Sequence, residues 1–399
     1  MSSITTEKFD FDRIIPRRDT GAIKADSLID AFGREDIIPL WIADMDFATP
    51  ACILDAIRKR CDHPVLGYTK PLAGYYESVI GWLQKRHGWS VARENVGFVS
   101  GIVPGLAFCL KAFTKPGDKV LIQTPVYPPF HNLTKNNERE LITNPLIIKE
   151  GCFQIDFDDF ERKLEGVSLF ILCNPHNPGG RVWSPDELRR MAEICYRKGV
   201  LVISDEIHCD LVLNGHTHTP FASVCMEARE NSVTLMAPSK TFNMAGLSSS
   251  FHIIFNEEIK RQLNRYLQGS ELANGHLFAF CATEAAYRNG EEWLNQALLY
   301  MQESVDYVID FLNKNTPGIK AMVPQASFLI WLDCRELGLS RRELVSFFVD
   351  EAGLALNDGT AFGKEGEGFM RINIGTPRSV LRKAMEQLKS AYEKRNFNF

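Results

Sequence analysis

The chain has 399 residues, of which 45% are hydrophobic and 24% are charged, and its formal net charge is -5. This composition is typical of a globular protein of one or two domains and excludes disordered and fibrous classes. Acidic and basic residues are interspersed, so the sequence predicts neither a nucleic-acid-binding surface nor a polybasic segment for membranes. The expected partners are therefore small molecules and further copies of the chain.

The ten cysteines never form a C-x-x-C pair, and several lie in apolar runs such as Phe170 to Cys173. This pattern is typical of reduced core cysteines, so we expect a cytoplasmic protein without a metal site. The N-terminal residues contain no apolar signal segment, and no later stretch reaches the roughly 18 apolar residues that cross a bilayer. We therefore expect no membrane association.

From about Val96 onward, short apolar runs alternate with segments of helical periodicity. The runs predict buried strands at 96–99, 120–122, 169–172, 200–203 and 233–236, and residues 185–198 predict an amphipathic helix. Buried strands that alternate with helices indicate an α/β fold with a mainly parallel sheet and right-handed crossovers. In such sheets, ligands bind beyond the carboxyl ends of the strands.

The C-terminal part of the chain predicts a smaller α+β region. Helical periodicity extends from Glu257 through Arg288 to Asn315. Short strands at 328–332 and 369–372 then alternate with helical segments at 341–351 and 378–394. We expect a large domain at 45–285 and a small domain formed by residues 1–44 together with 286–399.

Two of four polar segments at predicted strand ends are rich in glycine. Ser100 to Gly105 opens a helix after the strand at 96–99, and free N–H groups at such a helix start suit a phosphate dianion. Residues 174–180, N-P-H-N-P-G-G, predict a rigid turn that presents the amide of Asn177 to a ligand. An ordinary helix start and a tight loop without a ligand are the alternatives.

The other two segments carry titratable side chains. Asp205 ends the strand at 200–203, and a buried carboxylate there requires a partner such as a protonated pyridine nitrogen. This pairing would make the pyridine ring an electron sink. His208, three residues further on, can reach a phenolic oxygen of the same ring or be structural. Lys240 follows the strand at 233–236 among small and hydroxyl residues, which suits imine formation with an aldehyde.

With these motifs, the chain resembles the fold-type-I pyridoxal 5′-phosphate (PLP) enzymes of the class I/II aminotransferase superfamily over essentially its whole length. The resemblance implies the PLP-dependent transferase fold with a seven-stranded sheet, a Schiff base on Lys240, and Tyr68 reaching the phosphate of a neighbouring subunit. It therefore implies a homodimer with shared active sites. The implied catalytic residues are Lys240, Asp205 and Tyr68. The implied cofactor-binding residues are Gly101, Ile102, Val103, Tyr127, Asn177, Asp205, His208, Ser239, Lys240 and Tyr68, and the implied substrate-binding residues are Arg371, Ala43 and Asn177.

Within this superfamily, three sequence words resemble the cystathionine β-lyases and cysteine-S-conjugate β-lyases. They are W-I-A-D-M-D-F at 41–47, S-D-E-I-H at 204–208 and K-T-F-N at 240–243. The resemblance predicts a lyase that acts on L-cystathionine or related cysteine S-conjugates and releases a thiol, pyruvate and ammonia. An amino-acid aminotransferase and a regulatory binding protein with residual lyase activity stay open as alternatives.

Two positions depart from the broad superfamily pattern. Ala237 and Ser248 stand where serine and arginine are frequent in that pattern. We therefore expect a phosphate to depend on the amides at 101–103, on Tyr68, and on hydroxyls such as those of Ser239 or Ser248.

Overall fold

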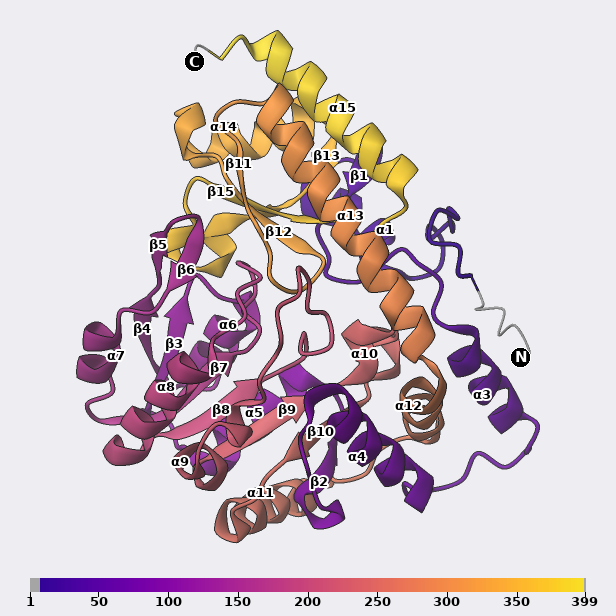
Figure 1. Cartoon of the computed structure of the whole chain (residues 1–399), viewed down its shortest axis with the longest axis vertical. Helices are drawn as coiled ribbons and strands as arrows, with labels where there is room; N and C mark the ends of the chain where they lie inside the picture. The colour runs from indigo at the N-terminus through magenta and orange to yellow at the C-terminus, as the bar shows by residue number, and fades with distance from the viewer. Residues whose placement is uncertain (1–7, 398–399) are drawn as a thin grey trace.

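The computed structural model describes residues 8–397, and its centre is a seven-stranded sheet in the order β2-β10-β9-β8-β7-β3-β4 (Figure 1). The strands are β2 (Val96–Val99), β10 (Ser250–Ile253), β9 (Ser232–Met236), β8 (Leu201–Asp205), β7 (Val167–Cys173), β3 (Lys119–Thr124) and β4 (Glu140–Pro145). Strand β10 pairs antiparallel with β2 and with β9, and the other neighbours pair in parallel. The predicted α/β fold with a mainly parallel sheet is confirmed.

Helices cover both faces of this sheet, which explains why its strands read as continuous apolar runs. Along β7, Leu169 and Ile171 pack into one cluster of buried side chains, and Phe170 and Leu172 pack into another. The first cluster includes side chains of α5 (Ile102–Phe113) and α11 (Glu257–Gly269), and the second includes those of α8 (Pro185–Lys198). Successive strand residues face opposite sides, so apolar residues occupy consecutive positions of such a strand.

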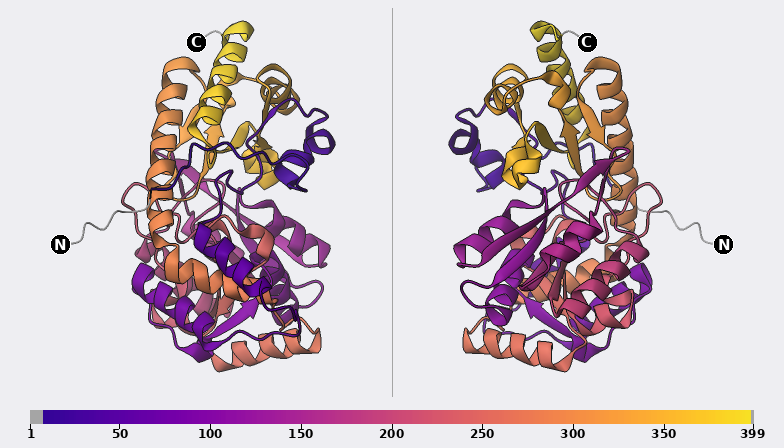
Figure 2. Two further views of the ribbon diagram at one scale, coloured as in Figure 1. Left: turned by 90° about the vertical axis from the view of Figure 1, so that its right-hand side faces the viewer. Right: turned by 90° about the vertical axis from the view of Figure 1, so that its left-hand side faces the viewer.

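A second, four-stranded sheet lies at the other end of the molecule, as the side views show (Figure 2). Its strands pair antiparallel in the order β11 (Lys320–Met322), β12 (Leu329–Asp333), β15 (Phe369–Asn373) and β14 (Asn357–Asp358). The flanking helices are α14 (Arg341–Ser346), which continues as a π-helix at Phe347–Glu351, and α15 (Arg378–Arg395). These elements confirm the α+β character predicted for the C-terminal part.

The helical stretch predicted between Glu257 and Asn315 consists of three separate helices. They are α11, α12 (Leu277–Asn289) and α13 (Glu291–Asn315). The long helix α13 runs along the molecule from the large sheet towards the small one (Figure 1). No helix among residues 8–397 is long and apolar enough to cross a bilayer.

The N-terminal part contains elements that the sequence analysis did not predict. Helices α1 (Ile23–Asp26) and α2 (Leu28–Phe32) precede β1 (Ile38–Pro39), which pairs in parallel with β13 (Leu354–Ala355). Helices α3 (Ala51–Cys61) and α4 (Ala73–His87) pack against α12 instead. The chain therefore crosses from the surroundings of the small sheet to those of the large sheet between residues 40 and 50.

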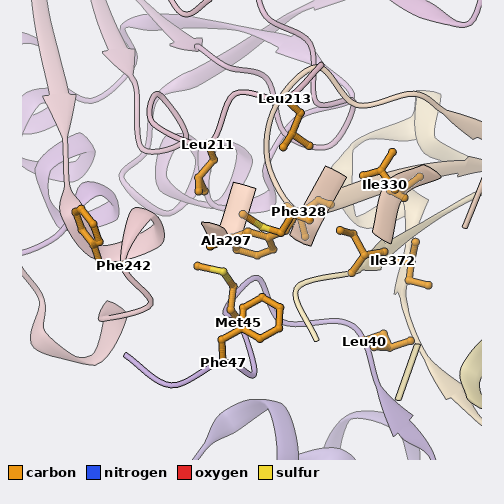
Figure 3. Close-up of a cluster of buried hydrophobic side chains, with 14 of the residues drawn as sticks. Leu40, Met45, Phe47, Leu211, Leu213, Phe242, Ala297, Phe328, Ile330 and Ile372 are labelled. Carbon is orange, nitrogen blue, oxygen red and sulfur yellow. The ribbon is translucent and has the colours of Figure 1, made fainter. Parts of the chain in front are cut away.

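This crossing segment is held by apolar packing. Leu40, Met45 and Phe47 belong to one cluster of buried side chains together with Phe328 of the small-sheet region and Phe242 beside α10 (Pro238–Thr241) (Figure 3). Because side chains from both regions contact it, the segment is fixed between them, next to the carboxyl ends of the large sheet.

Candidate active site

A cavity of about 250 Å³ lies at the carboxyl ends of the parallel strands β7 and β8. Most of the residues predicted for cofactor or substrate binding line it, together with Ser248, whereas Arg371 does not; they are Ala43, Gly101, Ile102, Val103, Tyr127, Asn177, Asp205, His208, Ser239 and Lys240. The remaining lining residues, which sequence reasoning did not single out, are Ser100, Pro104, Cys173, Ile207, Ala245, Ser249 and Ser250. The four polar segments therefore converge on one cavity.

Lys240 projects into this cavity from α10, the single turn that follows β9. Its Nζ donates a hydrogen bond to the backbone carbonyl of Ala43. The pKa of Lys240 is lowered to about 8, mainly by burial and in smaller part by the charge of Arg371, whereas Asp44 and Asp205 oppose the shift. A lowered pKa increases the fraction of neutral amine, which is the nucleophilic form of lysine.

Asp205 ends β8, lines the cavity and is 3% exposed. Its Oδ1 accepts a hydrogen bond of 3.1 Å from the backbone N–H of Ile207. The pKa of Asp205 is raised to about 7, mainly by burial and in smaller part by Glu206, while the Ile207 N–H and Lys240 act in the opposite direction. Burial disfavours the charged form of this carboxyl group, and a cation bound next to it would favour that form.

The start of α5 forms a cradle of backbone N–H groups at the cavity wall. Gly101 is the N-cap residue with φ 135°, and as a glycine it offers no side chain to cap this helix. A Cβ atom at Gly101 would lie 3.1 Å from Cδ of Pro104, so glycine serves both the backbone conformation and the close approach. Together with the hydroxyls of Ser100, Ser239 and Ser248 on the same cavity, this helix start suits an anion.

Arg371 lies on β15 of the small sheet, 4% exposed, and reaches the large-sheet residue Asn177. Its Nη1 donates to Oδ1 of Asn177 at 3.0 Å, and its Nη2 donates to the Trp41 carbonyl at 2.9 Å and to Oδ1 of Asn357 at 2.7 Å. Its Nε has no hydrogen-bond partner within the described part of the chain. Burial lowers the pKa of Arg371 to about 10. A buried guanidinium with only neutral partners is suited to bind a ligand carboxylate.

Tyr127 and His208 complete the cavity wall. Tyr127 precedes α6 (Pro128–Asn136), and burial raises the pKa of its hydroxyl. His208 is buried against Phe328, with ring centroids 6.2 Å apart, and its Nδ1 lacks a hydrogen-bond partner among residues 8–397. Burial lowers the pKa of His208 to about 3, so it presents a neutral ring.

Tyr68 does not lie in this cavity. It is fully exposed, in the segment between α3 and α4, and it does not line the site of its own chain. Its predicted role at the phosphate of a neighbouring subunit stays a prediction, as do the catalytic and binding roles of the other site residues.

A cluster of four charged residues holds the segment that carries Ala43. Arg17 donates to Asp44 at 2.6 Å and to Asp46 at 2.8 Å, and Lys24, which is 1% exposed, donates to Asp46 at 2.8 Å. The sequence word at 41–47 points to the two aspartates, but no spacing rule relates them to the two cations that precede them. We refer to Arg17, Lys24, Asp44 and Asp46 as the ion cluster.

Asn243 ties the same segment to the Lys240 region. Its side chain accepts the N–H of Met45 at 3.0 Å and donates to the carbonyls of Met45 and Phe47 at 2.9 and 2.7 Å. From the small sheet, Asn373 donates to the carbonyls of Ile42 and Asp44 at 2.6 and 2.7 Å. The carbonyl of Ala43 is thereby held above Lys240 by residues from both sheet regions.

Comparison with known proteins places the chain in a family. Residues 35–388 match the model of the family described as aminotransferase class I and II. Cystathionine beta-lyase PatB of Bacillus subtilis (strain 168) is 44% identical over 383 residues, which are 96% of this chain and 99% of that protein. Cystalysin from Treponema denticola, a structure that contains PLP, has a TM-score of 0.95 and 34% identity, covering 98% of this chain and 100% of that one.

A PLP-bound C–S lyase from Staphylococcus hominis superposes with a TM-score of 0.91 and 36% identity, over 97% of this chain and 98% of that chain. The family model, the sequence relative and the two structures all span nearly the whole chain. The chain therefore belongs to the class I and II aminotransferase family.

Proposed function

We propose that this protein is a PLP-dependent carbon–sulfur β-lyase that converts L-cystathionine or a related cysteine S-conjugate to a thiol, pyruvate and ammonia. The observation that carries the proposal is the 44% identity to the cystathionine β-lyase of Bacillus subtilis over 96% of the chain. The PLP in the structures of cystalysin and the C–S lyase supports the same cofactor here.

The residues of the cavity fit PLP. Lys240, with its lowered pKa, suits imine formation with the aldehyde, and Asp205, which forms no ion pair among residues 8–397, suits the pyridine nitrogen. The uncapped start of α5 suits the phosphate, and the unpartnered Nδ1 of His208 can serve a ring substituent. Bound there, PLP would supply an electron-accepting ring that stabilises negative charge at the α-carbon of an amino acid.

The protein's own side chains would then orient the substrate and move one proton. Arg371 would bind the α-carboxylate through its guanidinium, and Asn177, which accepts its Nη1–H, would keep that guanidinium in place. The neutral amine of Lys240 would take the proton from the α-carbon, a role that contributes roughly 10² to 10⁴-fold to the rate. With a thiolate as the leaving group on the β-carbon, loss of that proton permits cleavage of the C–S bond.

An amino-acid aminotransferase is the second candidate, because the matching family model is described as aminotransferase class I and II. Both reactions need the same cavity, the same lysine and the same carboxylate-binding arginine. They differ in whether an oxo acid is required for repeated turnover, and this difference provides the test.

The test is the amount of pyruvate formed per active site from L-cystathionine, with and without 2-oxoglutarate. A lyase releases pyruvate through many turnovers without the oxo acid, whereas an aminotransferase stops after about one turnover because the amino group stays on the cofactor. The Lys240→Ala variant serves as the control for pyruvate that forms without the enzyme. Turnover that strictly requires 2-oxoglutarate would identify an aminotransferase instead.

We also propose a homodimer in which Tyr68 completes the site of the neighbouring subunit. The side chain of Tyr68 is fully exposed, and Val65, Leu66 and Leu72 of the same segment are 62%, 61% and 69% exposed. Exposed apolar side chains that are contiguous in the chain support a protein interface. The dimer is thus supported by an apolar surface around Tyr68 that would be exposed to water in a monomer.

Two further assignments belong to the proposal. We divide the chain into a large domain at 45–285 and a small domain of residues 1–44 with 286–399, and the two separate sheets support this division. We place the enzyme in the cytoplasm, because its ten cysteines are all free of disulfide bonds.

A further inference from the structure

A buried carboxylate outside the cavity collects three hydrogen bonds. Asp210, 1% exposed, accepts at Oδ1 from Nε1 of Trp82 at 3.0 Å and from Nε2 of His87 at 2.9 Å, and at Oδ2 from the hydroxyl of Thr241 at 2.9 Å. Trp82 and His87 belong to α4, and Thr241 is the last residue of α10. Asp210 therefore joins α4 to the turn that carries Lys240.

The carboxylate of Asp210 is the acceptor at the centre of this group. Burial acts to raise its pKa, but the bonds from His87, Trp82 and Thr241 outweigh burial and lower the pKa below its ordinary value. Asp210 also lies near Cys209 and His87, with all three potential ligand atoms within 4.8 Å of one another. Because indole and hydroxyl donors already occupy both oxygens, we interpret the group as a hydrogen-bond centre and not as a metal site.

A second buried carboxylate, that of Glu206 next to Asp205 in the chain, has the same kind of surroundings. Glu206 accepts from the hydroxyl of Ser204 at 2.8 Å and from Nε2 of His218 at 2.8 Å. The ring of His218 contacts the ring of His87, with 5.4 Å between centroids. Glu206 and Thr241, which follow Asp205 and Lys240 in the chain, are thus both hydrogen-bonded to buried groups outside the cavity lining.

The short helix α10, which carries Lys240, requires stabilising contacts from outside the helix. Helix α10 has only four residues, and the backbone bonds that close it are Phe242 N–H to Pro238 O and Met244 N–H to Ser239 O, both at 2.9 Å. A single helical turn is not stable by itself, because nucleation fixes several dihedral angles for one hydrogen bond. The hydroxyl of Thr241 adds a side-chain anchor next to Lys240.

We propose that Asp210 is a positioning residue for Lys240: by holding the Thr241 hydroxyl, it fixes the turn from which the lysine amine reaches the α-carbon of the substrate. This inference rests on the proposed function, and it adds Asp210 and Thr241 to the residues on which the rate depends. A displacement of a reacting group by about 1 Å can cost roughly 10²-fold in rate. The effect should therefore fall on kcat and leave KM nearly unchanged, because neither residue lines the cavity.

The test uses three variants of the full chain. Thr241→Val removes the hydroxyl at nearly constant volume, Thr241→Ser restores it, and Thr316→Val serves as the matched control. Thr316 is also fully buried, and its hydroxyl donates to the carbonyl of Leu312 at the end of α13, far along the chain from Lys240. The measurements are kcat and KM for L-cystathionine and hydrogen exchange of the backbone amides at 240–244.

We expect Thr241→Val to lower kcat at least tenfold with KM within about threefold of the wild type, and to accelerate amide exchange at 240–244. Thr241→Ser should recover most of kcat, and Thr316→Val should change neither quantity. A folded Thr241→Val variant with wild-type kcat would overturn the positioning role. So would an equal loss of kcat in Thr316→Val, since that would reflect general destabilisation.

A second readout keeps this test separate from the proposed function. Wild-type protein and the variants are incubated with PLP and reduced with borohydride, and the rate at which Lys240 is labelled is measured by mass spectrometry. If Lys240 is labelled in the wild-type protein but that protein shows no lyase turnover, the proposed reaction is wrong. The ratio of labelling rates between variant and wild type then still tests the positioning role. Labelling of Thr241→Val at the wild-type rate would contradict that role. Should Thr241→Val not fold, the same two measurements on Asp210→Asn replace it, with the same outcomes.

Discussion

At the scale of single residues, burial is the main cause of opposite pKa shifts in two groups of the cavity. Burial is the largest cause both of the lowered pKa of Lys240, about 8, and of the raised pKa of Asp205, about 7. Both shifts reflect the same rule, because a low-dielectric surrounding disfavours the charged form of either group. The cavity therefore holds an amine that loses its proton readily and a carboxylate that requires a cation.

The raised pKa of Asp205 predicts a pH-dependent stability of the cofactor-free chain. The pKa is about 7 in the folded protein and 3.8 without the shift, so the folded state binds the proton more tightly. The resulting stabilisation is fully present below pH 3.8 and is lost as the pH rises to about 7. Asp205→Asn, which cannot ionise, should therefore gain stability relative to the wild type as the pH rises through this window.

Urea unfolding of cofactor-free wild type and Asp205→Asn at several pH values between 4 and 7.5 measures this difference. The exposed Asp158, changed to Asn, is the control and should follow the wild-type pH dependence. A stability difference between Asp205→Asn and wild type that stays constant with pH would show that Asp205 has no raised pKa.

At the scale of elements, the segment from Trp41 to Phe47 connects the two sheet regions and contributes Ala43 to the lining of the cavity. It contributes the Ala43 carbonyl to Lys240 and the Trp41 carbonyl to Arg371. Because its own backbone forms neither helix nor strand, several of its carbonyls are satisfied by side chains, and the N–H of Asp46 donates to the carbonyl of Gly375. The segment is also held by the ion cluster, in which Arg17 and Lys24 bind its Asp44 and Asp46.

Lys24→Met should destabilise the protein, because it removes a fully buried ammonium and leaves Asp46 with Arg17 as its cationic partner. Breaking a buried ion pair costs 3 to 5 kcal/mol, and Asp46 is partly solvated, so we expect a loss of about 2 kcal/mol in the free energy of unfolding. The control is Lys320→Met, which breaks an exposed pair with Glu336 and should cost less than about 1 kcal/mol.

Chemical denaturation of both variants measures the two losses. Equal losses for Lys24→Met and Lys320→Met would mean that the ion cluster contributes no more than a surface pair. A larger loss for Lys24→Met, together with a raised KM for L-cystathionine, is the expected result, since the segment it anchors also contacts Arg371.

Which elements could be predicted from the sequence depended on their surroundings. The strands β7, β8 and β9 are covered by helices on both faces, and their apolar runs revealed them. Strand β4 at the sheet edge and strand β10 were not predicted, because β4 is partly exposed and β10 contains Ser250 and His252. Polar residues in these short strands conceal the pattern that burial on both faces produces.

At the scale of the whole molecule, the proposed shared site has a direct consequence. Tyr68→Ala and Lys240→Ala chains, each inactive alone, should recover part of the activity after mixing, because one of the two sites in a hybrid dimer contains both intact residues. The expected recovery is at most about a quarter of the wild-type activity for random exchange, since half of the dimers are hybrids with one intact site of two.

The measurement is pyruvate formation after subunit exchange, which is followed by mass spectrometry of differently labelled chains. A mixture of Lys240→Ala with Lys240→Ala,Tyr68→Ala chains is the control and should stay inactive. If exchange is complete and the Tyr68→Ala and Lys240→Ala mixture stays inactive, each site is built from one chain.

The sequence by itself was sufficient for the α/β fold with its mainly parallel sheet and for the side chains at the strand ends. The location of Asn177, Asp205 and Lys240 at the same edge of the sheet could be predicted. A buried parallel strand has a continuous apolar pattern, and polar residues that closely follow it must lie at its carboxyl end. The local pattern therefore determined both the strands and the position of these groups.

Only the tertiary structure decided which distant residues meet them. The hydrogen bond from Arg371 to Asn177, the Ala43 carbonyl at Lys240, and the anchoring of Thr241 by Asp210 join residues that no periodicity relates. These contacts depend on how the two sheet regions and α4 pack against one another, and packing of whole elements leaves no signal in the spacing of residues along the chain. The pKa shifts of Lys240 and Asp205 also depend on the tertiary structure, because they follow from burial by surrounding elements.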